Sequence, residues 1–292
     1  MELNELKNCV WAISKTSLCI TAKDIRNGLT IKEIPINKRG IISPLDLALL
    51  NDKIYILDNS NLWSVNIWTH KIHLNELEVH NYHSLVATDK EIYIIGNVSY
   101  RFSPKSKLCR IADIKINGVL FPGKCYMNGS IYFIGGAKEF ITDKVYQYEC
   151  ATQQTIELPL KLPLGLEACG CFPLDNNLMI VGGRTESSCL SNFCYWIEME
   201  NQKIYLAPYL YRNGFFRNTS CAMSGDLIGL MDENKNLHVY NKRHSSWKFY
   251  SEFLWKKRAN FIWVWRMAKK NKCQGNIDKL PLSLVMEIAK YF

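Results

Sequence analysis

The chain has 292 residues, of which 48% are hydrophobic and 22% are charged, and its formal net charge is +9. This composition is that of an ordinary globular protein and excludes a mainly disordered or collagen-like chain. No uncharged apolar run approaches the roughly 18 residues of a membrane-spanning helix, and residues 1–8 lack the apolar core of a secretory signal, so neither feature is expected.

The positive charge is concentrated in one part of the sequence. Residues 253–292 hold nine Lys and Arg and two acidic residues, so residues 1–252 carry a net charge of only +2. A nearly neutral body offers no phosphate-binding face, and no nucleic-acid partner is expected. The eleven cysteines are odd in number and irregularly spaced, which predicts reduced thiols in a cytoplasmic protein, in the host cytosol if the source is a pathogen.

One short pattern recurs along residues 1–252. Each copy is an apolar strand, often with Tyr in second place, that ends at Gly or a turn residue and is followed by a second apolar-aromatic strand. The first strands of the five clear copies are expected at 54–58, 92–96, 131–136, 178–183 and 227–232. A sixth, degenerate copy is expected upstream, at residues 18–20.

The spacing of the copies indicates the fold. The copies begin 36 to 49 residues apart, a period typical of β-propellers. A small antiparallel sheet of this length cannot bury both of its faces, whereas radial stacking buries them and leaves only short edges. The Ile, Val, Tyr and Phe content and the frequent Gly and Asn disfavour helical repeats. The sequence therefore predicts an all-β propeller of six blades over residues 1–252.

Two copies end in a glycine pair, Gly135-Gly136 and Gly182-Gly183, and a third keeps a single glycine at Gly96. A chain that turns sharply near a crowded axis needs positive φ and no Cβ. These glycines, and the aromatic residues of the repeats, are therefore expected to serve turns and packing. The aromatic residues concerned are Tyr55, Tyr93, Tyr132, Tyr148, Tyr240 and Trp247.

The repeats resemble those of kelch-type β-propellers. The residues that carry the resemblance are the segment 131–136, Tyr146, Tyr148, Gly182, Gly183, Tyr195, Tyr240 and Trp247, the last pair at the kelch Tyr-to-Trp spacing. The resemblance covers about residues 10–250 and implies a kelch-type propeller that binds other proteins. The Trp-Asp signature of the other common propeller family is absent from the repeats.

The functional residues of propellers lie on loops at one end of the channel. The longer polar connections are 137–143, 184–192 and 209–217, and the last of them mixes Arg with aromatic residues, as protein interfaces do. The alternative is a solvated loop with some buried aromatic side chains. The residues predicted to contact a protein client are Arg184, Tyr209, Tyr211, Arg212, Phe215 and Arg217.

No motif for catalysis or for a cofactor is found, so a non-enzymatic protein without a cofactor is expected. Four histidines, His70, His73, His80 and His83, lie close together but lack a completing Cys or carboxylate pair, so partly exposed histidines are expected rather than a metal site. The Cys169-Gly170-Cys171 segment is expected to begin a strand with buried free thiols. A propeller enzyme with a ligand or metal in its channel stays an open alternative.

The segment 253–292 departs from the strand pattern and predicts a basic α-helical extension. A first helix is expected from about residue 253 to 268, and a second over 282–292, with Pro281 in its first turn. Leu284, Val285, Ile288 and Tyr291 form an apolar stripe on the second helix, which can pack on the propeller or on a partner.

The residues Leu280, Pro281, Leu284, Ile288 and Tyr291 resemble the opening helix of an F-box, the segment that docks on the Skp1 adaptor. The Leu-Pro-Leu run is also similar to the end of a SOCS box, which binds elongins and a cullin. A complete F-box is longer than this segment, and the helix that precedes the end of a SOCS box is not matched. The resemblance implies an adaptor that recruits a substrate to a cullin-type ubiquitin ligase.

The charge of this segment suggests an alternative to the adaptor function. Basic and aromatic residues interleave over 253–272, a pattern that suits an anionic membrane surface. On this hypothesis the protein is a propeller associated with a membrane surface or the cytoskeleton.

Overall fold

The computed structural model describes residues 8–251, with breaks at 15–17, 37–40, 42–43, 59–60, 77–81, 97–98, 104–107, 112–113, 115, 117–119, 138, 211 and 217–220. The chain divides into two compact units, Met1–Phe249 and Tyr250–Phe292. The helices and the membrane-binding segment expected within 253–292 lie outside the described residues. Over the residues that are described, no helix is long and apolar enough to cross a membrane.

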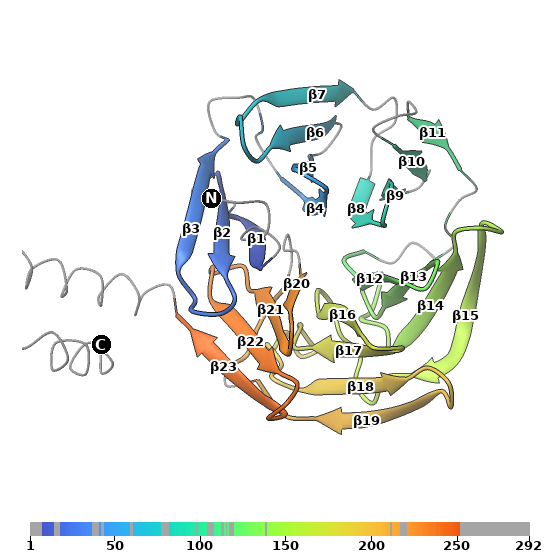
Figure 1. The fold of residues 1–292 in the computed structure, drawn as a ribbon. Helices are drawn as coiled ribbons and strands as arrows, with labels where there is room; N and C mark the ends of the chain where they lie inside the picture. Colours follow the sequence, from blue (N-terminus) through green and yellow to red (C-terminus); the bar gives the residue numbers. More distant parts are fainter. Residues whose placement is uncertain are drawn as a thin grey trace, which may run out of the picture. The chain divides into compact units, whose positions relative to one another are not determined.

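The first unit consists of six antiparallel sheets arranged in a ring around a central axis (Figure 1). Blade 1 contains β1 (Cys9–Ser14), β2 (Cys19–Asp24) and β3 (Thr30–Pro35). Blade 2 contains β4 (Asp46–Leu50), β5 (Lys53–Leu57), β6 (Asn61–Asn66) and β7 (Ile72–Glu76). Blade 3 contains β8 (Tyr82–Ala87), β9 (Ile92–Gly96), β10 (Tyr100–Phe102) and β11 (Cys109–Arg110).

The second half of the ring repeats this plan. Blade 4 contains β12 (Gly123–Met127), β13 (Ser130–Ile134), β14 (Lys144–Glu149) and β15 (Gln154–Lys161). Blade 5 contains β16 (Gly170–Leu174), β17 (Asn177–Val181), β18 (Cys194–Glu198) and β19 (Lys203–Ala207). Blade 6 contains β20 (Cys221–Ser224), β21 (Leu227–Met231), β22 (Leu237–Asn241) and β23 (Ser246–Tyr250). The predicted six-bladed propeller is therefore confirmed.

The strands expected from the five clear copies are the second strands of blades 2 to 6, namely β5, β9, β13, β17 and β21. Short hairpins connect the first strand of a blade to the second, and residues at these turns, among them Asn51, Asn128 and Asp175, have positive φ. The second strands are almost wholly buried because neighbouring sheets cover both of their faces.

Among the described residues, five hydrophobic clusters are each shared by two neighbouring blades. Ile134 of blade 4 and Ile180 of blade 5 belong to one of them. Of the residues expected to pack, Tyr55, Tyr93, Tyr132, Tyr148 and Tyr240 are buried, and the Trp247 ring lies against Tyr240. Radial stacking thus buries the surfaces that a single sheet leaves exposed.

The glycine pairs act as predicted. Gly135, Gly136, Gly182 and Gly183 all have positive φ, between 59° and 101°. A Cβ on Gly135 would overlap the carbonyl oxygen of Leu166, which belongs to the connection to the next blade. Glycine is required there both for backbone conformation and for the close approach of the neighbouring chain.

Blade 1 differs from the other five because it has three strands among the described residues. Its β3 runs along the rim in the same sense as β7 and β23 (Figure 1), so β1, β2 and β3 correspond to the second, third and fourth strands of the other blades. The upstream copy expected at 18–20 is therefore wrongly placed, because these residues begin β2, which corresponds to a third strand. The strand that corresponds to the second strands of the other blades is β1, which the sequence analysis missed. Leu18 to Ile20 mimic the pattern because third strands are also apolar.

The ring closes where blade 1 meets blade 6. Strand β1 packs against β20 and β21, and a Cβ on Gly229 of β21 would overlap the Ile25 side chain and lie 2.9 Å from Val10. The buried Lys23 donates a hydrogen bond from Nζ to the Lys235 carbonyl oxygen at 2.6 Å. Among the described strands, each sheet is built from consecutive strands, so closure depends on packing between sheets.

Candidate functional site

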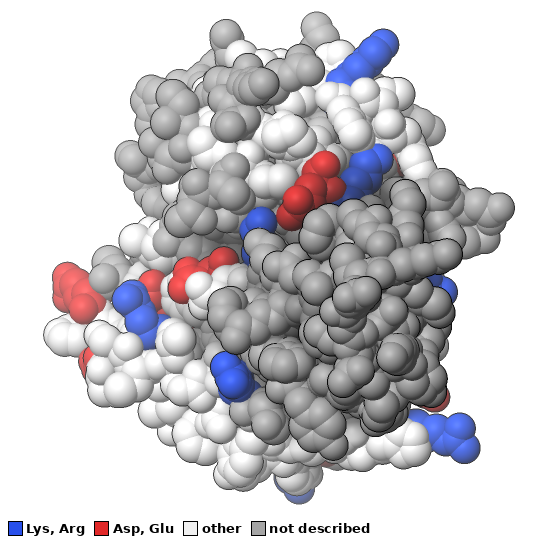
Figure 2. Space-filling model, turned by 90° about the vertical axis from the view of Figure 1, so that its left-hand side faces the viewer, with Lys and Arg blue, Asp and Glu red and all other residues white. Residues whose placement is uncertain are grey.

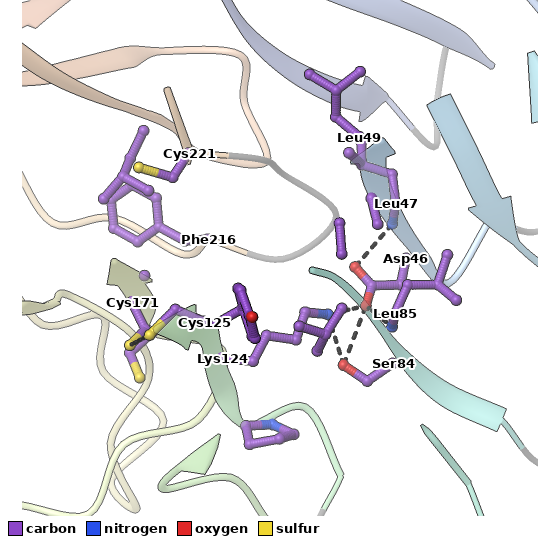
Figure 3. A pocket seen from close by; sticks show the side chains of 18 of the residues that line it. Asp46, Leu47, Leu49, Ser84, Leu85, Lys124, Cys125, Cys171, Phe216 and Cys221 are labelled. Atoms are coloured by element: carbon purple, nitrogen blue, oxygen red, sulfur yellow. Dashed lines mark hydrogen bonds and ion pairs between the residues drawn. The ribbon is translucent and has the colours of Figure 1, made fainter. Parts of the chain in front are cut away.

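An axial cavity of about 360 Å³ lies where the first strands of blades 2 to 6 converge. Figure 3 shows its two contrasting walls. One wall is polar and is formed by Asp46 of β4, Ser84 of β8 and Lys124 of β12. The other wall carries Phe216, Cys221 and the pair Cys125 and Cys171, whose two sulfurs lie side by side in the same view.

The polar wall is an ion pair that joins three blades. The Lys124 ammonium reaches across to Asp46 Oδ2 and donates to Ser84 Oγ at 2.6 Å. The Asp46 carboxylate also accepts hydrogen bonds from the backbone N–H groups of Leu47, at 2.8 Å, and Leu85, at 2.7 Å. A buried carboxylate with this many donors is well compensated for the loss of water. This polar wall therefore stabilises the contact between blades 2, 3 and 4.

The opposite wall gathers thiols. Cys125 of β12 and Cys171 of β16 lie with their sulfurs 3.2 Å apart, and Cys169 and Cys221 are close by. Burial raises the pKa of Cys169 to about 12 and raises the pKa of Cys171 well above its usual value. These thiols are free, and Cys169 and Cys171 are buried, as the sequence predicted for these two.

The four clustered histidines were expected to be partly exposed and not to bind a metal ion. His70 and His73 are exposed, while His80 and the His83 side chain lie outside the described part of the chain. Within the ranges that the structure describes, no group of three or more His, Cys, Asp or Glu side chains is arranged to hold a metal ion.

A second candidate site is the loop face, which we define as the described residues of 135–143, 162–169, 182–193 and 208–216, that is, without 138 and 211. These four connections of blades 4 to 6 are joined by backbone hydrogen bonds. Gly136 N–H donates to Leu166 O at 2.7 Å, and Gly183 N–H donates to Gly214 O at 2.8 Å. The segments are therefore held as one surface although they are far apart in the sequence.

The loop face presents apolar side chains to solvent. Phe140 is 72% exposed, and Tyr209 is 51% exposed. The Tyr209 ring meets the exposed Phe193 ring edge-on, with centroids 5.3 Å apart. Next to this pair is an open depression lined by Leu164, Leu190 and the polar residues 185–187. An exposed aromatic pair beside a depression has the form of an anchor site for another macromolecule.

The six residues predicted to contact a client are placed differently by the structure. Arg184 forms a forked ion pair with the buried Glu167, at 3.0 Å from Nε and 2.5 Å from Nη2, and so holds two connections of the loop face together. Tyr209 is exposed, and the Arg212 guanidinium lies 5.2 Å from the centre of the Phe249 ring. Phe215 is half-buried and accepts a hydrogen bond at its carbonyl from Glu233 N–H at 3.0 Å.

The remaining predicted contact residues lie outside the described residues. They are Tyr211 and Arg217 of the loop, and Leu280, Pro281, Leu284, Ile288 and Tyr291 of the C-terminal segment.

Sequence reasoning missed Phe193, which meets the Tyr209 ring, Leu190, which lines the depression beside Phe193, and the exposed Phe140. All three sit in or beside the connections 137–143 and 184–192 that the sequence singled out, but nothing in the pattern showed that these connections meet. The only sequence signal for these exposed side chains was an apolar residue within a polar connection.

Charge on the side of the molecule formed by blades 1 and 6 is mixed. Figure 2 shows basic and acidic side chains next to one another over the described part of this side. The ion pairs there include Arg26 with Asp24 at 2.5 Å and Lys235 with Glu33 at 3.8 Å.

Comparison with known proteins agrees with the fold. No protein-family model matches the sequence, and no curated protein matches it. Among solved structures, 1133 chains match, including the one titled "Structure of YjhT", a kelch-like structural neighbour, with a TM-score of 0.50 and 12% sequence identity. That match covers 56% of this chain and 63% of the other. At this identity the likeness shows the fold, a six-bladed β-propeller.

Proposed function

We propose that this propeller is a non-enzymatic interaction module that binds a protein client on its loop face. The observation that carries the proposal is the exposed Phe193–Tyr209 pair, which stands beside an open depression on connections joined by backbone hydrogen bonds. Aromatic and Arg side chains are the residues that most often supply binding energy at protein interfaces.

The rigidity of the loop face supports this function. Because Arg184, Glu167 and the backbone bonds already fix the connections, little conformational entropy remains to be lost when a partner binds. The apolar side chains of Phe140, Leu190 and Tyr209 are exposed within the described part of the chain.

The chemistry of the surface indicates what the client presents. An apolar side chain of the client would occupy the depression beside Phe193, because Leu164 and Leu190 line it. Arg212 stacks on an aromatic ring and keeps its charge at the edge of this surface, so an acidic residue of the client would be favoured there.

The test compares variants of the full chain in affinity capture followed by mass spectrometry. Replacing both aromatic residues, Phe193→Ala with Tyr209→Ala, should abolish recovery of clients that the unmodified protein captures. The matched control is Tyr205→Ala with Leu206→Ala, since these two side chains are as exposed but lie on β19 at the rim of the same blade. Equal recovery by both double variants, with unchanged thermal unfolding, would show that the loop face does not bind the client.

The more specific function of a ubiquitin-ligase adaptor rests on the resemblance of Leu280, Pro281, Leu284, Ile288 and Tyr291 to a docking helix. We infer that this segment recruits an adaptor of the Skp1 or elongin type while the propeller recruits the substrate. The full chain with Leu284→Asp should then fail to bind purified Skp1 or elongin, whereas Ser283→Asp, outside the predicted apolar stripe, should bind normally. Absence of binding by the unmodified chain would refute this function and leave client binding to be judged separately.

A further inference from the structure

Two thiols from neighbouring blades meet at the wall of the axial cavity. Cys125 lies in β12 of blade 4 and Cys171 in β16 of blade 5, and these two strands pack directly against each other. The Cys171 thiol donates to the Cys125 sulfur at 3.2 Å, and both side chains line the cavity (Figure 3). The two cysteines are 46 residues apart in the sequence.

We propose that Cys125 and Cys171 form a redox modification site, at which a small peroxide oxidises the two thiols to a disulfide that links blade 4 to blade 5. The site is distinct from the loop face, and the proposal does not depend on client binding.

The geometry selects this pair among the clustered thiols. A disulfide places its sulfurs about 2 Å apart, so closing the pair needs an approach of roughly 1 Å, within the reach of small side-chain rotations. Cys169 is the nearest competitor in the sequence, but its Sγ faces the Ile134 carbonyl oxygen at 3.8 Å and lies against Gly123, whose absent Cβ leaves room for the sulfur.

The chemistry balances with hydrogen peroxide as the oxidant. The sulfur of one cysteine attacks the O–O bond, which gives a sulfenic acid and one water. The sulfur of the second cysteine then displaces the sulfenic oxygen, which leaves as a second water while the S–S bond forms. The two sulfurs together lose two electrons, which the peroxide gains, and both thiol protons end in water.

The cavity determines which oxidants reach the pair. Its volume of about 360 Å³ admits a peroxide molecule, and both cysteines are more than nine-tenths buried. Burial raises the pKa of Cys171, and the groups that interact with it are the thiols of Cys125, Cys169 and Cys221, so the reactive thiolate is scarce near neutral pH. The site therefore responds to sustained oxidation and is slower to react than the exposed thiols.

The test treats the full chain with hydrogen peroxide, blocks the remaining thiols with a maleimide in denaturant, and maps tryptic peptides. We expect residues 125–138 to be joined to residues 162–184 with the loss of two hydrogens, reversibly with dithiothreitol. Because the second peptide contains both Cys169 and Cys171, fragment ions and two matched variants assign the bond. The variant Cys169→Ser should keep the link, and Cys171→Ser should abolish it.

The exposed Cys109 and Cys189 report whether the oxidant is active. If these two are fully oxidised and Cys125 and Cys171 are still both recovered as blocked free thiols after prolonged treatment, the proposal is overturned. A link that survives Cys171→Ser and is lost in Cys169→Ser overturns it as well. If the proposal holds, oxidation should also raise the thermal midpoint of the unmodified chain by roughly 5 °C or more, and leave that of Cys171→Ser unchanged.

Discussion

Loss of the ammonium group at Lys124 should destabilise the ring far more than loss of an exposed lysine. In the variant Lys124→Met, the buried Asp46 carboxylate keeps its bonds from Leu47, Leu85 and Ser84 but loses its only described cationic partner. Breaking a buried ion pair costs about 3–5 kcal/mol. Because three donors remain and the Lys124 side chain is 20% exposed, we expect a loss of about 2–3 kcal/mol of unfolding free energy.

The measurement is urea unfolding of the full chain, and the matched control makes the same substitution in the same blade. Lys144 pairs with Glu157 at 2.9 Å, but both side chains are exposed, so Lys144→Met should cost far less stability than Lys124→Met. The reasoning is refuted if the two variants lose the same free energy. It is also refuted if Lys124→Met costs as much in an Asp46→Asn background, because the loss would then not arise from the pair.

Three further predictions concern the backbone, a partly buried ion pair and the buried thiols. Gly135→Ala should cost about 2–4 kcal/mol in urea unfolding, because of its positive φ and the overlap with a neighbouring carbonyl, whereas Gly129→Ala, with positive φ but open space, should cost about 1 kcal/mol. The hydrogen bond from Arg26 lowers the pKa of Asp24, so its stabilisation is present above the unfolded pKa of about 4 and is lost as pH falls through the lower folded value. Arg26→Ala should therefore lose less stability than the unmodified chain between about pH 6 and pH 3, in the same assay. Burial raises the pKa of Cys194 to about 12, so its alkylation at about pH 8 should be on the order of 1000-fold slower than that of the exposed thiols, as followed by mass spectrometry.

The blades could be predicted from the sequence because their signal is local. The second strands, such as β13 and β17, combine an uninterrupted apolar run with a glycine pair whose backbone requirement is visible in one short segment. The strands around the axis carry no such signal. Gly123–Met127 mixes Gly, Lys, Cys and Tyr, because Lys124 pairs with Asp46 of blade 2 while Cys125 meets Cys171 of blade 5.

The candidate sites are contacts between blades, and no local pattern encodes them. Asp46 and Lys124 are 78 residues apart, and Cys125 and Cys171 are 46 apart. Arg184 was predicted to face a client because Arg in a polar connection usually does so. In the structure Arg184 bonds to Glu167, 17 residues away, and so holds two connections together. The residue type alone could not reveal this role.

The meeting of blades 1 and 6 has a mechanical consequence. Separating these two blades breaks side-chain contacts and the bond from Lys23 to Lys235, but within the described strands it interrupts no ladder of any sheet. The ring can thus open at this junction while every sheet, as far as its strands are described, keeps its pairing. A force pulling the ring apart, or a protease probing its transient openings, would meet its least resistance there.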